Sequence, residues 1–167
     1  MVTTDDVDWA LHEKDLPRIK EEYHTLAHFY LEEMQKGKPF EFFHFNLDLT
    51  GGPCLPKRLC GCGAGFEYMA VAPNGDLYPC HQFVGREEYL LGNIYDGVKR
   101  TDIVEKFRQN HIYHKPECAS CWARFYCSGG CAANAQSFHQ DITKPYDLGC
   151  AISKLRLEAA IWLAVKK

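Results

Sequence analysis

The chain has 167 residues, 46% of them hydrophobic, and a formal net charge of -3 at pH 7. A chain of this size can bury one modest core, and its slightly acidic balance excludes a general attraction to nucleic acid or to an anionic membrane surface. It has no apolar run of roughly 18 residues that could span a bilayer, and residues 1–8 are acidic where a secretory signal is basic. We therefore expect a cytoplasmic protein.

The N-terminal part predicts one helix followed by one strand. Apolar residues recur at helical spacing between Asp15 and Gly37, while most of the intervening Lys, Glu and His residues fall on the opposite face. Residues 40–49 are dense in aromatic side chains that alternate, which is typical of a strand buried on at least one face. We expect residues 1–50 to form this single αβ unit.

The middle of the chain predicts a small α+β domain over residues 51–150. Residues 51–62 are rich in Gly, Pro and Cys and indicate a loop that needs another organiser. Residues 68–72 and 76–79 predict two strands joined by the turn Pro73-Asn74-Gly75. Further helices are expected at 101–109, capped by Thr101 or Asp102, at 132–139, and in the C-terminal segment 151–167.

Nine cysteines are the most informative feature of the composition. A reducing cytoplasm disfavours disulfides, so that clustered thiols become candidate metal ligands or catalysts, and an odd number leaves one thiol over in any all-disulfide scheme. Disulfide bonding is therefore the less favoured alternative.

One group of cysteines has the spacing Cys118-x2-Cys121-x5-Cys127-x3-Cys131, with Cys150 further downstream. Thiols two residues apart can reach one metal centre from a single turn of loop, both in zinc sites and in iron-sulfur sites. The spacing indicates a metal without identifying it. Five cysteines exceed the four that one tetrahedral zinc or one cluster requires, so at least one of them serves a second site.

The other group consists of Cys54, Cys60, Cys62 and Cys80. Three of these with one cysteine of the downstream group would complete a second four-cysteine site, which uses eight of the nine thiols. Several glycines stand beside these cysteines, and their missing Cβ atoms would let backbone N–H groups approach cluster sulfurs. The number of cysteines therefore favours two metal sites.

The cysteine spacing resembles the SPASM domain, which follows the catalytic core in radical S-adenosylmethionine enzymes. The resemblance rests on Cys62-x12-Gly75-x4-Cys80, on the spacing from Cys118 to Cys131, and on Cys150. The sequence from Glu67 to Gly85, EYMAVAPNGDLYPCHQFVG, further resembles the maturases of six-cysteines-in-forty-five peptides, which form thioether cross-links.

The resemblance implies two 4Fe-4S clusters with interleaved ligands. One cluster would take Cys54, Cys62, Cys80 and Cys131, and the other would take Cys118, Cys121, Cys127 and Cys150. Cys60 would be the spare thiol, although its spacing to Gly75 also fits the family, so that the choice between Cys60 and Cys62 stays open. The helix and strand before Gly51 would be the last piece of a partial barrel.

One feature of the family is missing, because no C-x3-C-x2-C motif for the cluster that cleaves S-adenosylmethionine occurs in the sequence. S-adenosylmethionine would then bind only to an N-terminal core outside this chain, as in a truncated enzyme or one half of a split system. We expect an auxiliary-cluster module that is not catalytic alone. Its partners would be that core and a cysteine-rich precursor peptide. The alternatives are an independent ferredoxin-like electron carrier and a structural zinc protein.

Overall fold

The computed structural model describes residues 8–49, 51 and 54–166, and it divides the chain into two compact units. Unit 1 consists of residues 1–54 and 146–167, and unit 2 consists of residues 55–145. The acidic residues 1–7 lie outside the described part. Among the described residues, no helix is both long and apolar enough to cross a membrane.

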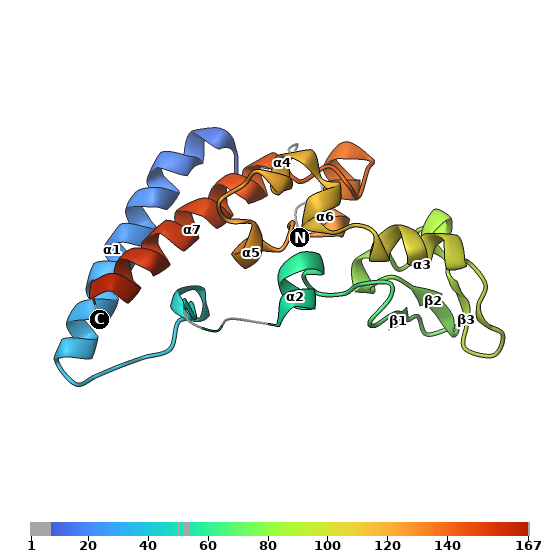
Figure 1. Cartoon of the computed structure of the whole chain (residues 1–167), viewed down its shortest axis with the longest axis horizontal. Helices are drawn as coiled ribbons and strands as arrows, with labels where there is room; N and C mark the ends of the chain where they lie inside the picture. The colour runs from blue at the N-terminus through green and yellow to red at the C-terminus, as the bar shows by residue number, and fades with distance from the viewer. Residues whose placement is uncertain (1–7, 50, 52–53, 167) are drawn as a thin grey trace. The chain divides into compact units, whose positions relative to one another are not determined.

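Unit 1 is built on two long helices that pack side by side, α1 (Leu16–Gln35) and α7 (Asp147–Lys166) (Figure 1). Small residues let them approach closely, since Ala27 of α1 and Ala159 and Ala160 of α7 are almost completely buried. The helix predicted from residue 15 to residue 37 is confirmed as α1, which follows the short 3-10 helix η1 (Glu13–Asp15). The C-terminal helix is confirmed as α7 and shares a unit with the N-terminal segment.

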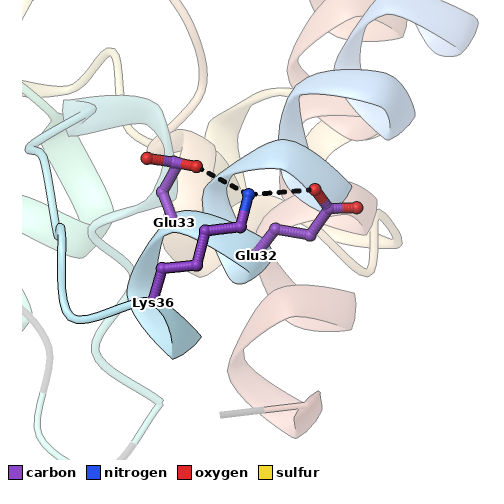
Figure 2. A network of polar contacts seen from close by, with 3 residues as sticks. All are labelled: Glu32, Glu33 and Lys36. Atoms are coloured by element: carbon purple, nitrogen blue, oxygen red, sulfur yellow. Dashed lines mark hydrogen bonds and ion pairs between the residues drawn. The ribbon is translucent and has the colours of Figure 1, made fainter.

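The last turn of α1 carries a small polar network (Figure 2). The Lys36 ammonium donates a hydrogen bond to Glu33 at 2.9 Å and lies 3.7 Å from the Glu32 carboxylate. The bond to Glu33 raises the pKa of Lys36. Gly37 follows with a left-handed backbone (φ 71°), which ends the helix.

The prediction of a strand at residues 40–49 is wrong. This segment holds a 3-10 helix, η2 (Phe43–Phe45), and no strand among its described residues. Phe45 is buried and Phe40 half-buried, whereas Phe43 is 72% exposed. The Tyr30 ring of α1 meets the Phe40 and Phe45 rings edge-on, at centroid distances of 4.9 and 5.6 Å. The aromatic residues of this segment therefore indicate packing against α1 and α7 and not a strand. The assignment to the last part of a partial barrel stays a prediction.

Unit 2 contains an antiparallel sheet of four short strands in the order β1-β2-β3-β4, which together with the helices makes the fold α+β. The strands are β1 (Ala70–Val71), β2 (Asp76–Tyr78), β3 (Gly92–Asn93) and β4 (Gly97–Val98). The predicted hairpin is confirmed, with Ala70 opposite Tyr78. Gly92 is required in β3, because a Cβ there would collide with the Gly97 carbonyl oxygen.

Short helices complete unit 2. They are α2 (Leu55–Cys60), η3 (His81–Phe83), η4 (Glu87–Tyr89), α3 (Thr101–Arg108), η5 (Ile112–His114), α4 (Pro116–Ala119), α5 (Arg124–Cys127) and α6 (Ala132–His139). The helices predicted at 101–109 and 132–139 are confirmed as α3 and α6. The predicted side-chain cap of α3 is wrong: its N-cap is Arg100, whose guanidinium forms two hydrogen bonds with Asp102, at 2.9 and 2.7 Å.

The core of unit 2 joins the sheet to α3 and α6. Phe83, Leu91 and Ile142 are completely buried in it, and the Tyr89 hydroxyl donates a 2.6 Å hydrogen bond to Gln136 of α6. Cys80 belongs to the same core and is only 6% exposed. The predicted metal ligand nearest the hairpin is thus held by packing on a rigid sheet.

Candidate metal centres

Three cysteines gather at the end of the hairpin: Cys62, Cys80 and Cys131, the hairpin set. Burial raises the pKa of the Cys80 thiol most, and negative charge on Cys131 and on Cys62 raises it further, while the backbone N–H groups of Gln82 and Phe83 lower it. The Tyr68 hydroxyl donates to the Cys62 sulfur at 3.8 Å, and the same three cysteines raise the pKa of Tyr68, after burial. Electrostatics therefore couples these four side chains.

Backbone contacts place the members of the hairpin set. Cys80 follows β2 and is the N-cap of η3, and Cys131 is the N-cap of α6. The loop that carries Cys62 is tied to the sheet, because the N–H of Gly65 bonds to the Pro79 carbonyl at 2.9 Å. Gly65 has a φ of 81°, and a Cβ there would lie 2.9 Å from the Phe107 ring, so this close approach requires glycine.

A second set of three cysteines, Cys118, Cys121 and Cys127, forms the loop set. Cys118 lies in α4 and is 7% exposed, and Cys127 is the last residue of α5. Burial raises the pKa of Cys118 most; the charges of Cys127 and Cys121 raise it as well, and the positive charge of Lys115 lowers it. The C-x2-C-x5-C spacing thus places Cys121 and Cys127 within electrostatic range of Cys118.

The two sets are linked by the short turn between Cys127 and Cys131. Ser128, Gly129 and Gly130 all have left-handed backbones, with φ between 58° and 83°. Such a run is costly for residues with a Cβ and explains the Gly-Gly pair, which sequence analysis had assigned to close approach of the backbone to a cluster. The turn lets one segment supply a ligand to each set.

The remaining three cysteines are Cys60 in unit 2 and Cys54 and Cys150 in unit 1. Burial raises the pKa of Cys60 most, followed by the charge of Glu67, whereas Lys115 and Lys57 lower it; no thiol is among these causes. Cys54 is exposed and belongs to unit 1, as does Cys150 in α7. Within unit 2, charge effects thus relate Cys62 and Cys131 to Cys80, and Cys121 and Cys127 to Cys118. The assignment of eight cluster ligands stays a prediction.

The chemistry of the two sets suits an iron-sulfur cluster. Burial and neighbouring thiols raise the pKa of Cys80 and of Cys118, and a positive centre would offset both effects. Soft thiolate sulfur is the usual ligand of iron-sulfur clusters. Among the described residues, no three Cys, His, Asp or Glu side chains are grouped tightly enough to hold a single metal ion. A four-iron cluster binds each cysteine through a different iron, and so its ligands do not need such a group.

Two residues beside the cysteines were missed in the sequence. Tyr68 was read only as part of the hairpin, yet its hydroxyl reaches Cys62. Lys115 belongs to no motif in the sequence, yet it is 2% exposed and donates a 2.9 Å hydrogen bond to the Gly129 carbonyl. The only signal in the sequence is their position, within six residues of a ligand.

Comparison with known proteins also points to iron-sulfur chemistry. Residues 60–122 match the SPASM family, described as an iron-sulfur cluster-binding domain. The match includes Cys60, Cys62, Cys80, Cys118 and Cys121 and ends before Cys127.

Three curated proteins are similar to parts of the chain. An uncharacterized protein of Archaeoglobus fulgidus is 33% identical over 75 residues, which are 43% of this chain and 18% of that protein. The antilisterial bacteriocin subtilosin biosynthesis protein AlbA of Bacillus subtilis is 32% identical over 101 residues, 53% of this chain and 22% of that protein. The mycofactocin maturase MftC of Mycolicibacterium smegmatis is 32% identical over 96 residues, 55% of this chain and 24% of that protein.

The aligned part of this chain thus spans about a fifth of the length of these relatives. Two of the three are named for the biosynthesis or maturation of a natural product. The family match over residues 60–122 and the cysteines of unit 2 point to the same chemistry, that of an iron-sulfur cluster-binding domain similar to the SPASM domain.

Proposed function

We propose that the chain is the auxiliary iron-sulfur module of a radical S-adenosylmethionine enzyme that modifies a ribosomally made peptide. The observation that carries this proposal is the grouping of six cysteines into the hairpin set and the loop set, inside and beside the segment that matches the SPASM family. The similarity to a bacteriocin biosynthesis protein and to a maturase supports a peptide substrate.

Each set has three thiols and would need one more for a four-cysteine cluster site. We assign Cys54 to the hairpin set and Cys150 to the loop set, as the resemblance to the SPASM domain implies. The electrostatic partners of Cys60 are Glu67, Lys115 and Lys57, which supports Cys62 rather than Cys60 as the ligand. Two 4Fe-4S clusters would then use eight of the nine cysteines.

The proposed reaction is the formation of a thioether cross-link, the chemistry of the six-cysteines-in-forty-five maturases that the hairpin resembles. A substrate thiolate bonds to a carbon radical made by the enzyme core, and this bond closure releases one electron. A bound cluster would supply both a Lewis acid that keeps the substrate cysteine as thiolate and an acceptor for that electron. This chain's own residues would present a displaceable ligand position.

Cys54 is the position that we expect to be displaceable. Its side chain is exposed, whereas Cys80 is anchored in the core of unit 2. Cys62 and Cys131 are exposed as well, but the first accepts a hydrogen bond from Tyr68 and the second is the N-cap of α6. A cysteine of the peptide substrate could therefore replace Cys54 at lower cost than any buried ligand. In the alternative, Cys54 is a fixed ligand and the cluster only conducts electrons.

Electron paramagnetic resonance of the reduced, reconstituted chain tests the proposal. A cysteine-containing precursor peptide should change the signal of one cluster, and the same peptide with Ser in place of Cys should not. Identical spectra with both peptides would contradict substrate binding at the cluster.

The isolated chain should not cleave S-adenosylmethionine, because it has no C-x3-C-x2-C motif. With dithionite as reductant, we expect no 5'-deoxyadenosine above that of a metal-free control, as measured by liquid chromatography with mass detection. Stoichiometric 5'-deoxyadenosine from the purified chain would show that the chain contains its own catalytic cluster.

A further inference from the structure

Lys115 is a buried cation placed beside one of the two thiol sets. Its side chain is 2% exposed, and burial of a lysine costs free energy unless the charge serves nearby groups. Its ammonium donates a 2.9 Å hydrogen bond to the Gly129 carbonyl, in the turn between Cys127 and Cys131. The charge is therefore held at a defined place inside the ligand-bearing loop.

The backbone of Lys115 holds the other side of the same loop. Its carbonyl accepts hydrogen bonds from the N–H of Cys118 at 2.9 Å and from the N–H of Ala119 at 3.0 Å. Lys115 is thereby the N-cap of α4, and the helix begins after it. One residue thus fixes both the segment that begins at Cys118 and the turn that follows Cys127. Gly129 lies directly beside the ammonium, because a Cβ at this position would be in van der Waals contact with the Lys115 Nζ, at 3.4 Å.

The positive charge of Lys115 changes the pKa of neighbouring thiols. It lowers the pKa of Cys118 and that of Cys60, in both cases against the larger effect of burial. It also lowers the pKa of Asp141, whose carboxylate accepts hydrogen bonds from the Thr143 N–H at 2.9 Å and from its hydroxyl at 2.8 Å. The ammonium therefore lies close enough to affect Cys118, the buried member of the loop set.

We propose that Lys115 sets the reduction potential of the cluster bound by the loop set, by stabilising the extra negative charge of its reduced state. This inference rests on the proposed function, because it requires a cluster at Cys118, Cys121 and Cys127. Net charge and hydrogen bonding around a cluster are the main determinants of its potential. A cation held nearby at low dielectric favours the more negative, reduced form and thus raises the potential.

Three substitutions separate the charge of Lys115 from its packing. Lys115→Met removes both the charge and the hydrogen bond to Gly129, Lys115→Gln keeps an N–H donor without the charge, and Lys115→Arg keeps the charge. Lys106→Met is the matched control, since Lys106 is an exposed lysine of α3 that also lowers the pKa of Asp141.

The measurement is a redox titration of the reconstituted chain followed by electron paramagnetic resonance. We expect Lys115→Met and Lys115→Gln to shift the reduction equilibrium of one cluster at least tenfold toward the oxidised form, about 59 mV for a one-electron couple. Lys115→Arg and Lys106→Met should stay within about twofold of the unsubstituted chain. A Cys62→Ala background, in which only the loop set keeps its cluster, should show the same shift.

The outcomes distinguish this inference from the proposed function. If the unsubstituted chain binds no cluster, the proposed function fails. If it binds two clusters but Lys115→Gln titrates at the original potential, or Lys115→Arg shifts as far as Lys115→Met, only the role of the Lys115 charge is overturned. Loss of iron in both neutral variants but not in Lys115→Arg would support that role, and equal loss in all three would show packing alone.

Discussion

Replacing Cys121 with alanine should remove one of two clusters and leave about four of about eight irons per chain, because each four-iron cluster uses four cysteines. Cys121 belongs to the loop set, and its charge raises the pKa of Cys118. Loss of one thiolate leaves an iron without its protein ligand. Iron and sulfide analysis of the anaerobically reconstituted variant measures the effect.

Cys60→Ala is the matched control, because Cys60 is a partly buried thiol whose electrostatic partners are Glu67, Lys115 and Lys57. This variant should keep all of its iron. If Cys60→Ala lost half of the iron while Cys62→Ala lost none, the assignment of Cys62 to the hairpin set would be wrong. An unchanged iron content in Cys121→Ala would contradict the claim that the loop set binds a cluster.

Removal of iron should unfold the loop set while the sheet of unit 2 persists. The helices α4 and α5 have four residues each; among its residues α4 buries only Cys118, and α5 buries none. Helices this short are not stable by themselves, and so metal binding must offset the entropy of ordering them. By contrast, α3 buries Ile103 and Phe107 in the core of unit 2.

Hydrogen exchange measured by mass spectrometry tests this difference. After chelation, residues 116–131 should lose most of their protection, while residues 101–108 should keep theirs. Restoring iron and sulfide should restore the protection. Equal protection of residues 116–131 with and without iron would show that packing alone orders the loop set.

The parts of the fold that could be predicted from sequence are those with local causes. The turn Pro73-Asn74-Gly75 dictates the hairpin of β1 and β2, and helical periodicity dictates α1. The strands β3 and β4 have two residues each and include Gly92 and Gly97, so they carry no pattern of their own. Their pairing depends on contacts across the sheet.

The error at residues 40–49 has a physical cause as well. Alternating aromatic residues indicate burial, and burial is what the structure shows, but the partners of Phe40 and Phe45 are helices rather than strands. Sequence alone does not identify the partner. The same limit explains why Lys115 was missed, because nothing in its neighbourhood in sequence separates it from a solvated lysine.

Cysteine spacing predicts candidate ligands because paired thiols a few residues apart are typical of metal sites, and the ligand assignment stays a prediction. The C-x2-C-x5-C spacing predicts that Cys118, Cys121 and Cys127 share a site, and the structure places them within electrostatic range. The grouping of Cys62, Cys80 and Cys131 spans much longer separations in sequence. It was predicted only through the resemblance to the SPASM domain.

Metal and sulfide analysis of the anaerobically purified and reconstituted chain, with its visible spectrum, tests the central claim most directly. Two four-iron clusters predict about eight irons and about eight acid-labile sulfides per chain, in a brown protein that absorbs broadly across the visible range. Zinc without sulfide in a colourless protein would contradict an iron-sulfur module and would indicate a structural zinc site instead.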